Sequence, residues 1–492
     1  MPSDGDVRLP QRVIGNSRRD LMSAFGCLLW CCAAGQLIAC GATDQRGGYD
    51  ETRYVLLSES LTAASPIDLP RPTQFPLGWP FVMSLVLQLG GGFVELHVLN
   101  KFLTLAASAI VVLYLHRRRE VSCGTATAFG AVFLSSRWTW YMADSLLAEP
   151  LFMVGVLVLL YVADAPGRPR SQSLMSLLTV GVLIAALRLV RTVGIAFVAA
   201  AVVQCIFLDR HEPPRARIRR AAAVMIPLLV LEVVLALFHP VSSVLFGSAY
   251  VGQAGGQELI PLVTLHFKNL VSSCIPISIN LWHPRILFQA GGAVLGVVGL
   301  AFVIRDCLQK KNIASSLVCA YLVLIVLWPY HSPRFFWPVA IYVVFMGLHG
   351  VAGVVADRFR KAVEESDRVW QRTGTATVLF LAGSSVLAVA VDPPLRREVG
   401  AARERGLLEA LVYIDETSKA PVAVGTYHCF RVFWHRRNWQ VSPLASHNDW
   451  QQADADGIDL VLCENEKLNR RGWQERGWKL VYDNGQVSVL RR

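Results

Sequence analysis

Long apolar stretches alternate with short polar segments along most of the chain. The first stretch runs from Leu21 to Cys40, and the second runs from Phe93 to Leu115. Because about 20 apolar residues in a helix cross the hydrocarbon core of a bilayer, each stretch predicts one membrane-spanning helix, although a short one could form two half-helices. Further stretches follow at residues 121–142, 146–163, 172–190, 193–208, 221–240, 286–304, 313–330, 335–355 and 375–391.

The composition agrees with this pattern. Of the 492 residues, 53% are hydrophobic and only 17% are charged, and the mean hydropathy is +0.43. A soluble protein of this length would not have enough interior to bury so much apolar surface. The sequence therefore predicts an α-helical polytopic membrane protein with about 11 transmembrane helices.

Arginine and lysine residues cluster between the apolar stretches. Positively charged loops stay on the cytoplasmic side of a membrane, and with eleven spans and a cytoplasmic N-terminus every cluster falls on that side. We therefore attribute the formal net charge of +11 to membrane orientation and expect no nucleic-acid partner. The clusters are Arg117–Arg119, Arg168 with Arg170, Arg210–Arg220, Arg305–Lys311 and Arg358–Lys361.

This topology divides the chain into three parts. Residues 1–21 form a cytoplasmic tail, residues 22–391 form the transmembrane domain, and residues 392–492 form a small domain outside the membrane. Two longer segments of the transmembrane domain, residues 41–92 and 241–284, lie on the same outer side. We expect an integral multi-pass protein of a bacterial inner membrane or plasma membrane, with its C-terminus extracytoplasmic.

The two outer segments have their own helical patterns. The first predicts an interfacial helix at residues 51–64 and an amphipathic one at residues 80–89, followed by a glycine hinge at Gly90–Gly92. The second segment contains a partly apolar stretch at residues 258–279, which could lie on the membrane as a lid.

The last hundred residues predict a small α/β domain. Residues 394–418 favour a helix, and residues 422–426 and 460–463 favour strands. The stretch from Lys479 to Leu490 predicts a hairpin that turns at Asn484-Gly485. Cys429 and Cys463 lie in this polar region, where an oxidising compartment would allow a disulfide.

Acidic residues gather at the predicted outer ends of the spans. Asp50 and Glu51 follow the first helix, while Asp144 and Glu149 occupy the outer turn between the third and fourth spans. Asp50 could be a solvated loop acid or a helix cap. Glu149 lies in apolar sequence at membrane depth, where an ionisable side chain usually has a function. We expect acids from both loops to meet in one outer cavity.

Basic residues appear on the same outer side, against the general charge bias. Arg188 and Arg191 flank the turn between the fifth and sixth spans, and His331 and Arg334 lie at the mouth of a later hairpin. A bound phosphate would account for them, since a guanidinium matches its geometry and is easily desolvated. The alternative is that these side chains snorkel, or pair with Asp144 and Glu149.

Carboxylates and arginines at a lipid-accessible outer cavity suit chemistry on a lipid phosphate. If that phosphate carries a sugar, it is a good leaving group and needs no general acid. One carboxylate could then deprotonate an acceptor hydroxyl from the opposite side, which would invert the anomeric carbon. The arginines would stabilise the charge that develops on the phosphate.

Several short motifs resemble the GT-C superfamily of polyprenyl-phosphate-sugar-dependent glycosyltransferases, in particular protein O-mannosyltransferases and lipid A aminoarabinose transferases. Each motif is weak alone, but their order along one topology is specific, and the spans cover roughly residues 20–391. The motifs are Asp50-Glu51-Thr52-Arg53-Tyr54, Phe75-Pro76-Leu77-Gly78-Trp79-Pro80, Ala148-Glu149-Pro150, Arg191-Thr192-Val193-Gly194 and Arg334-Phe335-Phe336-Trp337-Pro338.

The resemblance implies an inverting membrane glycosyltransferase with its site on the outer face. It implies Asp50 as the base, with Glu51 and Glu149 as further catalytic acids, and a polyprenyl-phosphate sugar as donor. The acceptor would be a hydroxyl of a lipid, glycan or protein. Donor phosphate would bind Arg188, Arg191, His331 and Arg334, and the cavity would be lined by Arg53, Tyr54, Trp79 and Asp144.

Two positions depart from the family pattern. Glu149 stands where an aspartate is common, which leaves open whether it contacts substrate or a metal. Phe335 stands where a tyrosine is common. Metal dependence varies in this superfamily, so a divalent cation stays open as a cofactor, although no residues here form a convincing cation site.

Two other functions compete with glycosyl transfer. A transporter or flippase of a lipid-linked sugar would also use basic outer residues, and Glu232, within a span, could be its relay residue or a buried acid paired with a neighbouring helix. The missing internal repeats and the long first outer loop argue against transport. A purely structural scaffold would leave the charge placement unexplained.

Overall fold

A computed structural model gives the arrangement of the chain. By contacts the chain divides into two units: one comprises Met1–Gly41, Leu99–Asp144 and Ala148–Asp392, and the other comprises Ala42–Val98, Ser145–Leu147 and Pro393–Arg492. The structure describes residues 11–39, 49–62, 76–164, 174–208, 213–238, 259–274, 285–310, 313–327, 333–360, 375, 378–380, 382–387, 396–418, 423–426, 432, 436, 439–444, 449–465 and 468–492.

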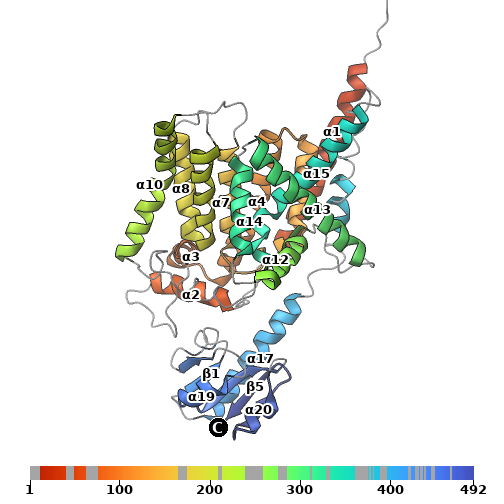
Figure 1. Cartoon of the computed structure of the whole chain (residues 1–492). Coiled ribbons are helices and arrows are strands. Elements are labelled where there is room, and N and C mark those ends of the chain that lie inside the picture. Colours follow the sequence, from red (N-terminus) through yellow and green to blue (C-terminus); the bar gives the residue numbers. More distant parts are fainter. Residues whose placement is uncertain are drawn as a thin grey trace, which may run out of the picture. The chain divides into compact units, whose positions relative to one another are not determined.

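The first unit is built from apolar helices. Helices α7, α8 and α10 stand side by side in it, as do α13 and α15 (Figure 1). Helix α4 begins in the second unit and continues into the first. The helices are α1 Gln11–Ala39, α4 Phe93–Arg118, α5 Cys123–Leu134, α6 Arg137–Ala143, α7 Glu149–Ala163, α8 Leu174–Val190, α9 Ile195–Val203, α10 Pro214–Phe238, α12 Leu259–Cys274, α13 Arg285–Arg305, α14 Ile313–Val326 and α15 Trp337–Arg360.

Among the residues that the structure describes, three helices are long and apolar enough to cross a membrane. They are the segments Leu21–Ala39, Phe93–Arg118 and Pro214–Leu237, and shorter apolar helices accompany them. This architecture confirms a helical membrane protein with a small C-terminal sheet. The number of eleven spans, and the side of the membrane on which each loop lies, stay predictions.

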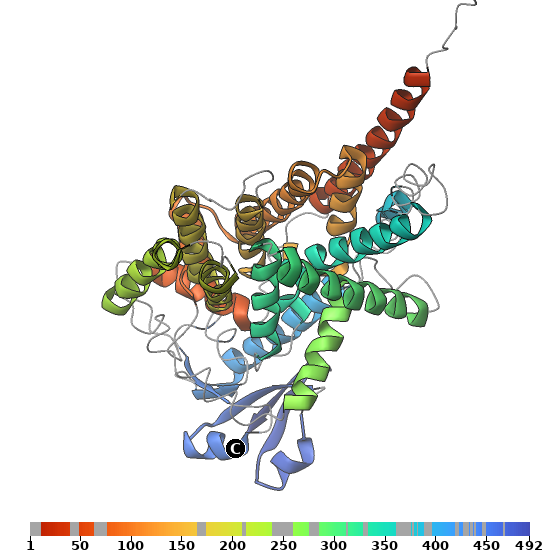
Figure 2. The same ribbon diagram turned by 45° about the horizontal axis from the view of Figure 1, so that its top comes forward.

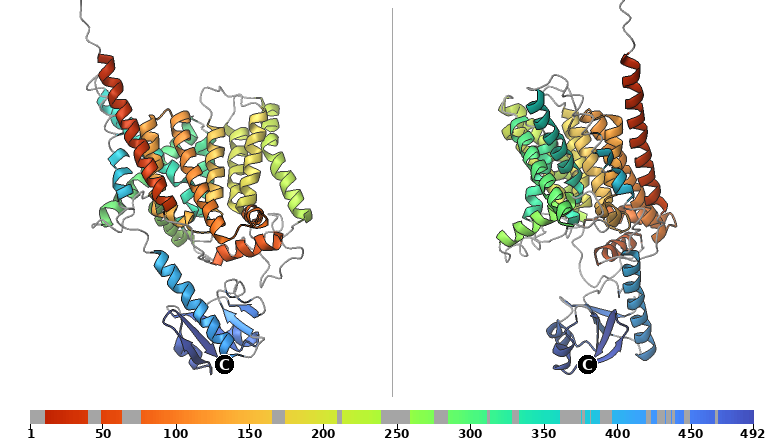
Figure 3. Two further views of the ribbon diagram at one scale, coloured as in Figure 1. Left: turned by 180° about the vertical axis from the view of Figure 1, so that it is seen from behind. Right: turned by 90° about the vertical axis from the view of Figure 1, so that its right-hand side faces the viewer.

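The first helix packs closely along α5 (Figure 3). Small residues allow this approach, because a Cβ atom on Gly26 would lie 2.3 Å from the carbonyl oxygen of Gly124. The indole of Trp30 also donates a hydrogen bond to Ser108 of α4 at 2.9 Å. Helix α1 begins at Gln11, so the residues expected to form a polar tail up to position 21 are half helical.

The predicted third span, residues 121–142, consists of two helices. Helix α5 ends at Leu134 and α6 begins at Arg137. Ser136 caps α6, because its hydroxyl accepts a hydrogen bond from the backbone N–H of Thr139 at 3.2 Å. The break turns the chain before it reaches Asp144 and Glu149.

Two short helices lie in the segment that was predicted to be the first outer loop. Helix α2 spans Tyr49–Thr62, helix α3 spans Gly78–Gln88, and the two are in contact. They confirm the helices expected near residues 51–64 and 80–89. Gly90, with φ of +84°, supplies the left-handed turn that separates α3 from α4. The partly apolar stretch at residues 258–279 contains helix α12, and its role as a lid stays a prediction.

Within the residues that the structure describes, the C-terminal domain has a five-stranded mixed sheet with helices on both faces (Figure 2). The strand order is β2-β1-β3-β5-β4, in which β1 runs parallel to β2 and β3, while β5 is antiparallel to β3 and β4. Strand β2 and the two short helices were not predicted. The elements are α17 Arg396–Thr417, β1 Ala423–Thr426, β2 Gln440–Pro443, α19 Trp450–Ala455, β3 Leu460–Glu464, α20 Arg470–Gln474, β4 Lys479–Asp483 and β5 Val487–Arg491.

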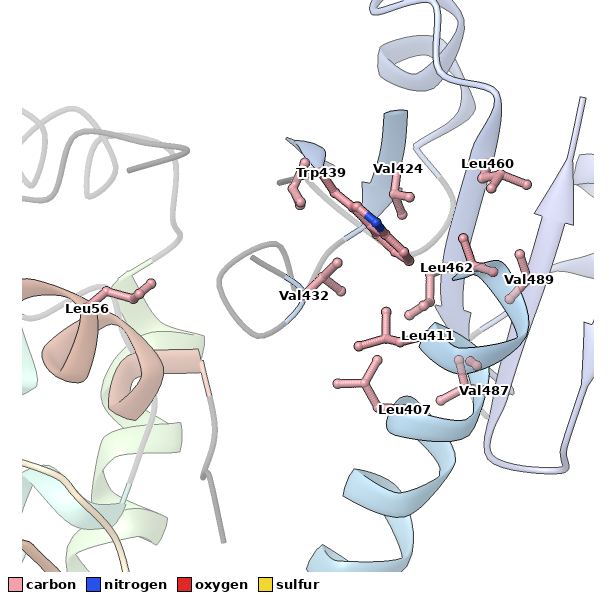
Figure 4. Close-up of a cluster of buried hydrophobic side chains, with 13 residues drawn as sticks. Leu56, Leu407, Leu411, Val424, Val432, Trp439, Leu460, Leu462, Val487 and Val489 are labelled. Atoms are coloured by element: carbon pink, nitrogen blue, oxygen red, sulfur yellow. The ribbon is translucent and has the colours of Figure 1, made fainter. Parts of the chain in front are cut away.

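Alternate residues of the strands build two cores in this domain. Leu407 and Leu411 of α17 face Leu462 and Val489 of the sheet (Figure 4). Val461, from the opposite face of β3, joins a second core that includes Trp473 of α20 and Trp478. Burial raises the pKa of the Cys463 thiol in that core to about 12. Its suggested disulfide partner, Cys429, lies outside the described residues.

Candidate active site

Asp50 and Glu51 lie in the first turn of α2. Acidic side chains are favourable there, because the N-terminal end of a helix carries a partial positive charge. Asp50 is half-buried, and Glu51 is only 5% exposed. Asp50 thus lies at the start of a helix, close to the helix-cap alternative, and its catalytic role stays a prediction. Whether Asp50 and Glu149 share one cavity stays a prediction.

The remaining motif residues of the second unit are also largely buried. Arg53 is half-buried and Tyr54 is buried in α2. Trp79 of α3 has no exposed surface, and its indole N–H donates a hydrogen bond to the carbonyl oxygen of Leu146 at 2.9 Å. This bond holds α3 against the chain segment that immediately precedes Glu149.

Glu149 is the centre of a charged cluster in the first unit. It is the first residue of α7, is followed by Pro150, and is 1% exposed. Its Oε1 atom accepts a hydrogen bond from Nη1 of Arg191 and lies 3.5 Å from Nε of Arg334. Two guanidinium groups around one carboxylate leave a net positive charge.

The ring of Phe335 contacts both arginines of this cluster. The guanidinium carbons of Arg191 and Arg334 lie 4.9 and 5.1 Å from its centroid. The Tyr321 hydroxyl donates a hydrogen bond to the Phe335 carbonyl oxygen at 2.8 Å, which fixes the backbone beneath the ring. Tyr321 in turn stacks on Phe197, with ring centroids 5.4 Å apart.

Both arginines keep part of their surface accessible. The side chains of Arg191 and Arg334 are 14% and 20% exposed, against 2% for Glu149. An anion that approached the cluster would therefore meet guanidinium groups rather than the carboxylate. The sequence alternative in which these arginines pair with Glu149 is confirmed for Arg191 and Arg334.

Arg188 pairs with Glu232 rather than with Glu149. Its Nε atom lies 3.1 Å from Oε1 of Glu232, which joins α8 to α10 through a buried ion pair. This pair accounts for both residues structurally, and it matches the expectation that Glu232 could be a buried acid paired with a neighbouring helix. Arg188 was expected to bind phosphate together with Arg191.

A second ion pair involves Asp144 and a residue that sequence reasoning missed. Nζ of Lys101, in α4, lies 3.8 Å from Oδ1 of Asp144, and both Lys101 and the neighbouring Asn100 are buried. A lysine within the apolar stretch 93–115 was the available signal, because ionisable residues inside spans usually have a function.

The segment from Thr139 to Glu149 contacts most of the sequence motifs. The Trp337 indole donates a hydrogen bond to the Thr139 hydroxyl at 3.0 Å, and Arg334 of the same motif pairs with Glu149. The motif therefore contacts this segment at both of its ends. Among the residues that the structure describes, no group of three or more His, Cys, Asp or Glu side chains could hold a metal ion. His331 lies outside the described residues, and a divalent cation stays a prediction.

Comparison with solved structures shows proteins of similar fold. Over 96% of this chain and 97% of the other, it superposes with a TM-score of 0.54 and 12% identity on ArnT, an aminoarabinose transferase from Cupriavidus metallidurans bound to undecaprenyl phosphate. It also superposes on the oligosaccharyltransferase AglB from Archaeoglobus fulgidus, in complex with an inhibitory peptide and a dolichol-phosphate. There the TM-score is 0.53 and the identity 13%, over 90% of this chain and 69% of the other.

Both of these proteins are GT-C glycosyltransferases, and the chain has the GT-C fold. The sequence itself matches no protein-family model and no curated protein. The fold expectation is therefore confirmed by structure rather than by sequence identity.

Proposed function

We propose that the chain is a membrane glycosyltransferase that moves a sugar from a polyprenyl-phosphate donor to a hydroxyl acceptor on the outer face of the membrane. The observation that carries this proposal is the cluster of Arg191 and Arg334 around Glu149, set in a GT-C fold. It supplies a preorganised positive site at a helix terminus. The bound polyprenyl phosphates of the two structural neighbours support a lipid-phosphate ligand.

The arginines would act on the donor phosphate. A sugar phosphodiester carries one negative charge, which balances the net charge of the cluster. When the bond to the sugar breaks, the departing lipid phosphate gains further negative charge, and two fixed guanidiniums stabilise it more than they stabilise the donor. Glu149 then has the role of holding both guanidiniums in place before the donor arrives.

Asp50 would act as the base. Its carboxylate removes the acceptor proton while the acceptor oxygen attacks the anomeric carbon from the face opposite the phosphate, so the configuration inverts. Its half-buried position in the first turn of α2 is compatible with this role.

Transport of a lipid-linked sugar has less support. The relay residue that it would use, Glu232, is held by Arg188 in a buried ion pair. A proton relay must change its charge during each cycle, whereas in this arrangement the carboxylate of Glu232 pairs with the buried guanidinium of Arg188.

The decisive experiment uses the full-length protein in proteoliposomes with a panel of polyprenyl-phosphate sugars. Transfer releases free polyprenyl phosphate and adds one glycosyl unit to the mass of an acceptor. Movement of intact donor across the bilayer without release would instead identify a transporter. A membrane-impermeant label on a cysteine introduced at position 50 tests the side, since labelling only from the cytosol excludes the proposed mechanism.

A further inference from the structure

Three aromatic side chains are buried together in the first unit, next to the segments that carry the charged cluster. Phe152 and Phe197 have no exposed surface, and Tyr321 is only 1% exposed. The ring centroid of Tyr321 lies 5.4 Å from that of Phe197 and 6.0 Å from that of Phe152. The two phenylalanine rings are 6.3 Å apart. These distances are typical of favourable ring contacts, and we call the three residues the aromatic triad.

The triad joins helices that begin at or near two members of the cluster. Phe152 lies three residues after Glu149 in α7, and Phe197 lies six residues after Arg191, in α9. Tyr321 belongs to α14, which contacts both of these helices. The rings therefore fix the relative positions of the two segments from which Glu149 and Arg191 meet.

The hydroxyl of Tyr321 reaches a third segment at an irregular point of the backbone. In a regular α-helix the backbone N–H of Val339 would bond to the carbonyl oxygen of Phe335, four residues earlier. Here the N–H groups of Val339 and Ala340 both donate to the Phe336 carbonyl oxygen, at 3.1 and 2.9 Å. The Tyr321 hydroxyl donates to the Phe335 carbonyl oxygen at 2.8 Å. A side chain of α14 thus helps to determine where α15 begins.

This bonded carbonyl group lies next to a member of the cluster. Arg334 directly precedes Phe335, and its Nε atom lies 3.5 Å from Oε1 of Glu149. A change of backbone conformation at Phe335 would move the Arg334 guanidinium relative to Glu149. A phenylalanine at position 321 could stack in the same way, but it could not bond to this carbonyl group. Burying a hydroxyl in an apolar helix costs free energy unless the hydroxyl is bonded, so stacking alone does not account for a tyrosine here.

We propose that Tyr321 is a positioning residue for the donor-phosphate site. Its ring is held by Phe152 and Phe197. Its hydroxyl holds the backbone of Phe335, so that Arg334 is in place before the lipid phosphate arrives. This inference rests on the proposed function and adds to it a residue that does not itself contact the donor. A guanidinium that is ordered in advance binds more tightly than one that must be ordered during binding.

The variant Tyr321→Phe tests the hydroxyl while keeping the ring. In the full-length protein, it should bind polyprenyl phosphate about threefold to tenfold more weakly, the range that one neutral hydrogen bond allows. Tyr342→Phe is the matched control, because it removes another buried hydroxyl of the first unit, one that bonds to Arg119 and Ser315. That control should lower the unfolding temperature but change the affinity for polyprenyl phosphate by less than about twofold.

A double-mutant cycle separates positioning from general destabilisation. Arg334→Ala removes the side chain that the hydroxyl positions but keeps the backbone carbonyl to which the hydroxyl bonds. In that background Tyr321→Phe should still lower the unfolding temperature, while most of its effect on affinity should disappear. A general loss of stability would not produce this difference. Unchanged affinity in Tyr321→Phe, or an equal loss of affinity in both backgrounds, overturns the positioning role.

Phe197→Leu is a second variant, which keeps the hydroxyl and serves if Tyr321→Phe does not fold. It loosens the ring stack around Tyr321 and should also weaken binding of polyprenyl phosphate, again with little further effect in Arg334→Ala. If the variants behave as expected but the unaltered protein transfers no sugar, the proposed reaction fails and the positioning role stands. If sugar transfer occurs and affinity does not depend on position 321, the reverse holds. An unaltered protein that binds no polyprenyl phosphate overturns both.

Discussion

Ion pairs in the first unit, which is helical, differ in burial from those in the C-terminal domain. In the helical unit the side chains of Arg188 and Glu232 are 3% and 10% exposed. In the C-terminal domain those of Arg471 and Glu475 are 90% and 58% exposed, although their atoms are just as close, at 2.9 Å. The same chemical contact therefore occurs in two environments within one chain.

Burial changes what such a pair does. An exposed pair is worth about 0–1 kcal/mol, because water solvates both partners once they separate. Loss of one partner of a buried pair costs about 3–5 kcal/mol, because a charge is left in a medium that solvates it poorly. The helical unit thus retains buried charges for a structural or chemical purpose, and substitutions can assign that purpose pair by pair.

If half-buried Asp50 performs chemistry rather than structure, its loss should have the largest effect on activity. Asp50→Asn should lower the rate of sugar transfer about 10²–10⁴-fold, the usual contribution of a general base. Expression, membrane insertion and donor binding should be unchanged. Glycosyl transfer in membranes that contain equal amounts of each protein measures the effect, with Glu59→Gln in the same helix as control. Full activity in Asp50→Asn would remove Asp50 as the base.

The Arg188–Glu232 pair should show the largest effect on stability. Arg188→Met leaves the Glu232 carboxylate buried without its guanidinium and should destabilise the folded protein by about 3–5 kcal/mol. The double variant Arg188→Met with Glu232→Leu should recover most of that loss, because no isolated charge remains. Thermal unfolding of the detergent-solubilised protein measures both.

The same double variant decides whether Arg188 also binds the donor. We expect donor affinity close to that of the unaltered protein, since Arg188 is held in its ion pair with Glu232. A stable double variant that no longer binds polyprenyl phosphate would restore Arg188 to the phosphate site. The matched surface control, Arg471→Met, should change stability by less than about 1 kcal/mol.

Arg191 and Arg334 should have intermediate effects, expressed in binding rather than in folding. Either substitution by alanine should weaken donor binding by about 1.5–3 kcal/mol, the range for hydrogen bonds to charged groups. One guanidinium still neutralises Glu149 in each variant, so stability should fall less than in Arg188→Met. Competition between labelled donor and polyprenyl phosphate measures the affinity. Unchanged affinity in both variants would mean that these arginines serve only to neutralise Glu149.

The sequence predicted the secondary-structure elements better than it predicted which side chains contact one another. Apolar stretches located the helices, and Asn484-Gly485 located a hairpin, because Gly485 adopts the positive φ of +82° that such a turn needs. Strand β2 escaped prediction because its four residues, Gln440–Pro443, include only one apolar side chain other than proline. Its place at the sheet edge depends on parallel pairing with β1, which no local pattern reports.

Side-chain partners depend on how each helix is rotated and how its ends are packed. Arg188 and Arg191 are three residues apart and looked equivalent in sequence, yet the first meets Glu232 and the second meets Glu149. Arg188 lies within α8, whereas Arg191 follows the helix and has extended backbone, with φ of −148°. The end of the helix separates the two, and its exact position was beyond the resolution of a hydropathy pattern.

The smallest predicted effect concerns Asp483, at the exposed hairpin of the C-terminal domain. The backbone N–H of Gly485, above all, and the side chains of Asn465 and Arg470 lower the pKa of this carboxyl group below its ordinary value of 3.8. Because the folded state lowers the pKa, ionised Asp483 stabilises the fold at neutral pH. That stabilisation should be lost as the pH falls below the unfolded-state pKa and through the lower folded-state pKa.

Hydrogen exchange of the β4 and β5 amides, corrected for intrinsic rates, measures this loss in the full-length protein. Between pH 6 and pH 3 their protection should decrease more in the unaltered chain than in Asp483→Asn, whose amide does not titrate over that range. The effect should stay within the limit of about 1 kcal/mol for exposed charged groups. Glu475→Gln, in the exposed pair with Arg471, is the matched control and should leave the pH dependence of the hairpin unchanged. An equal decrease in Asp483→Asn would show that other groups control the acid response, and that a surface carboxylate with three hydrogen-bond donors contributes little beside the buried charges of the helices.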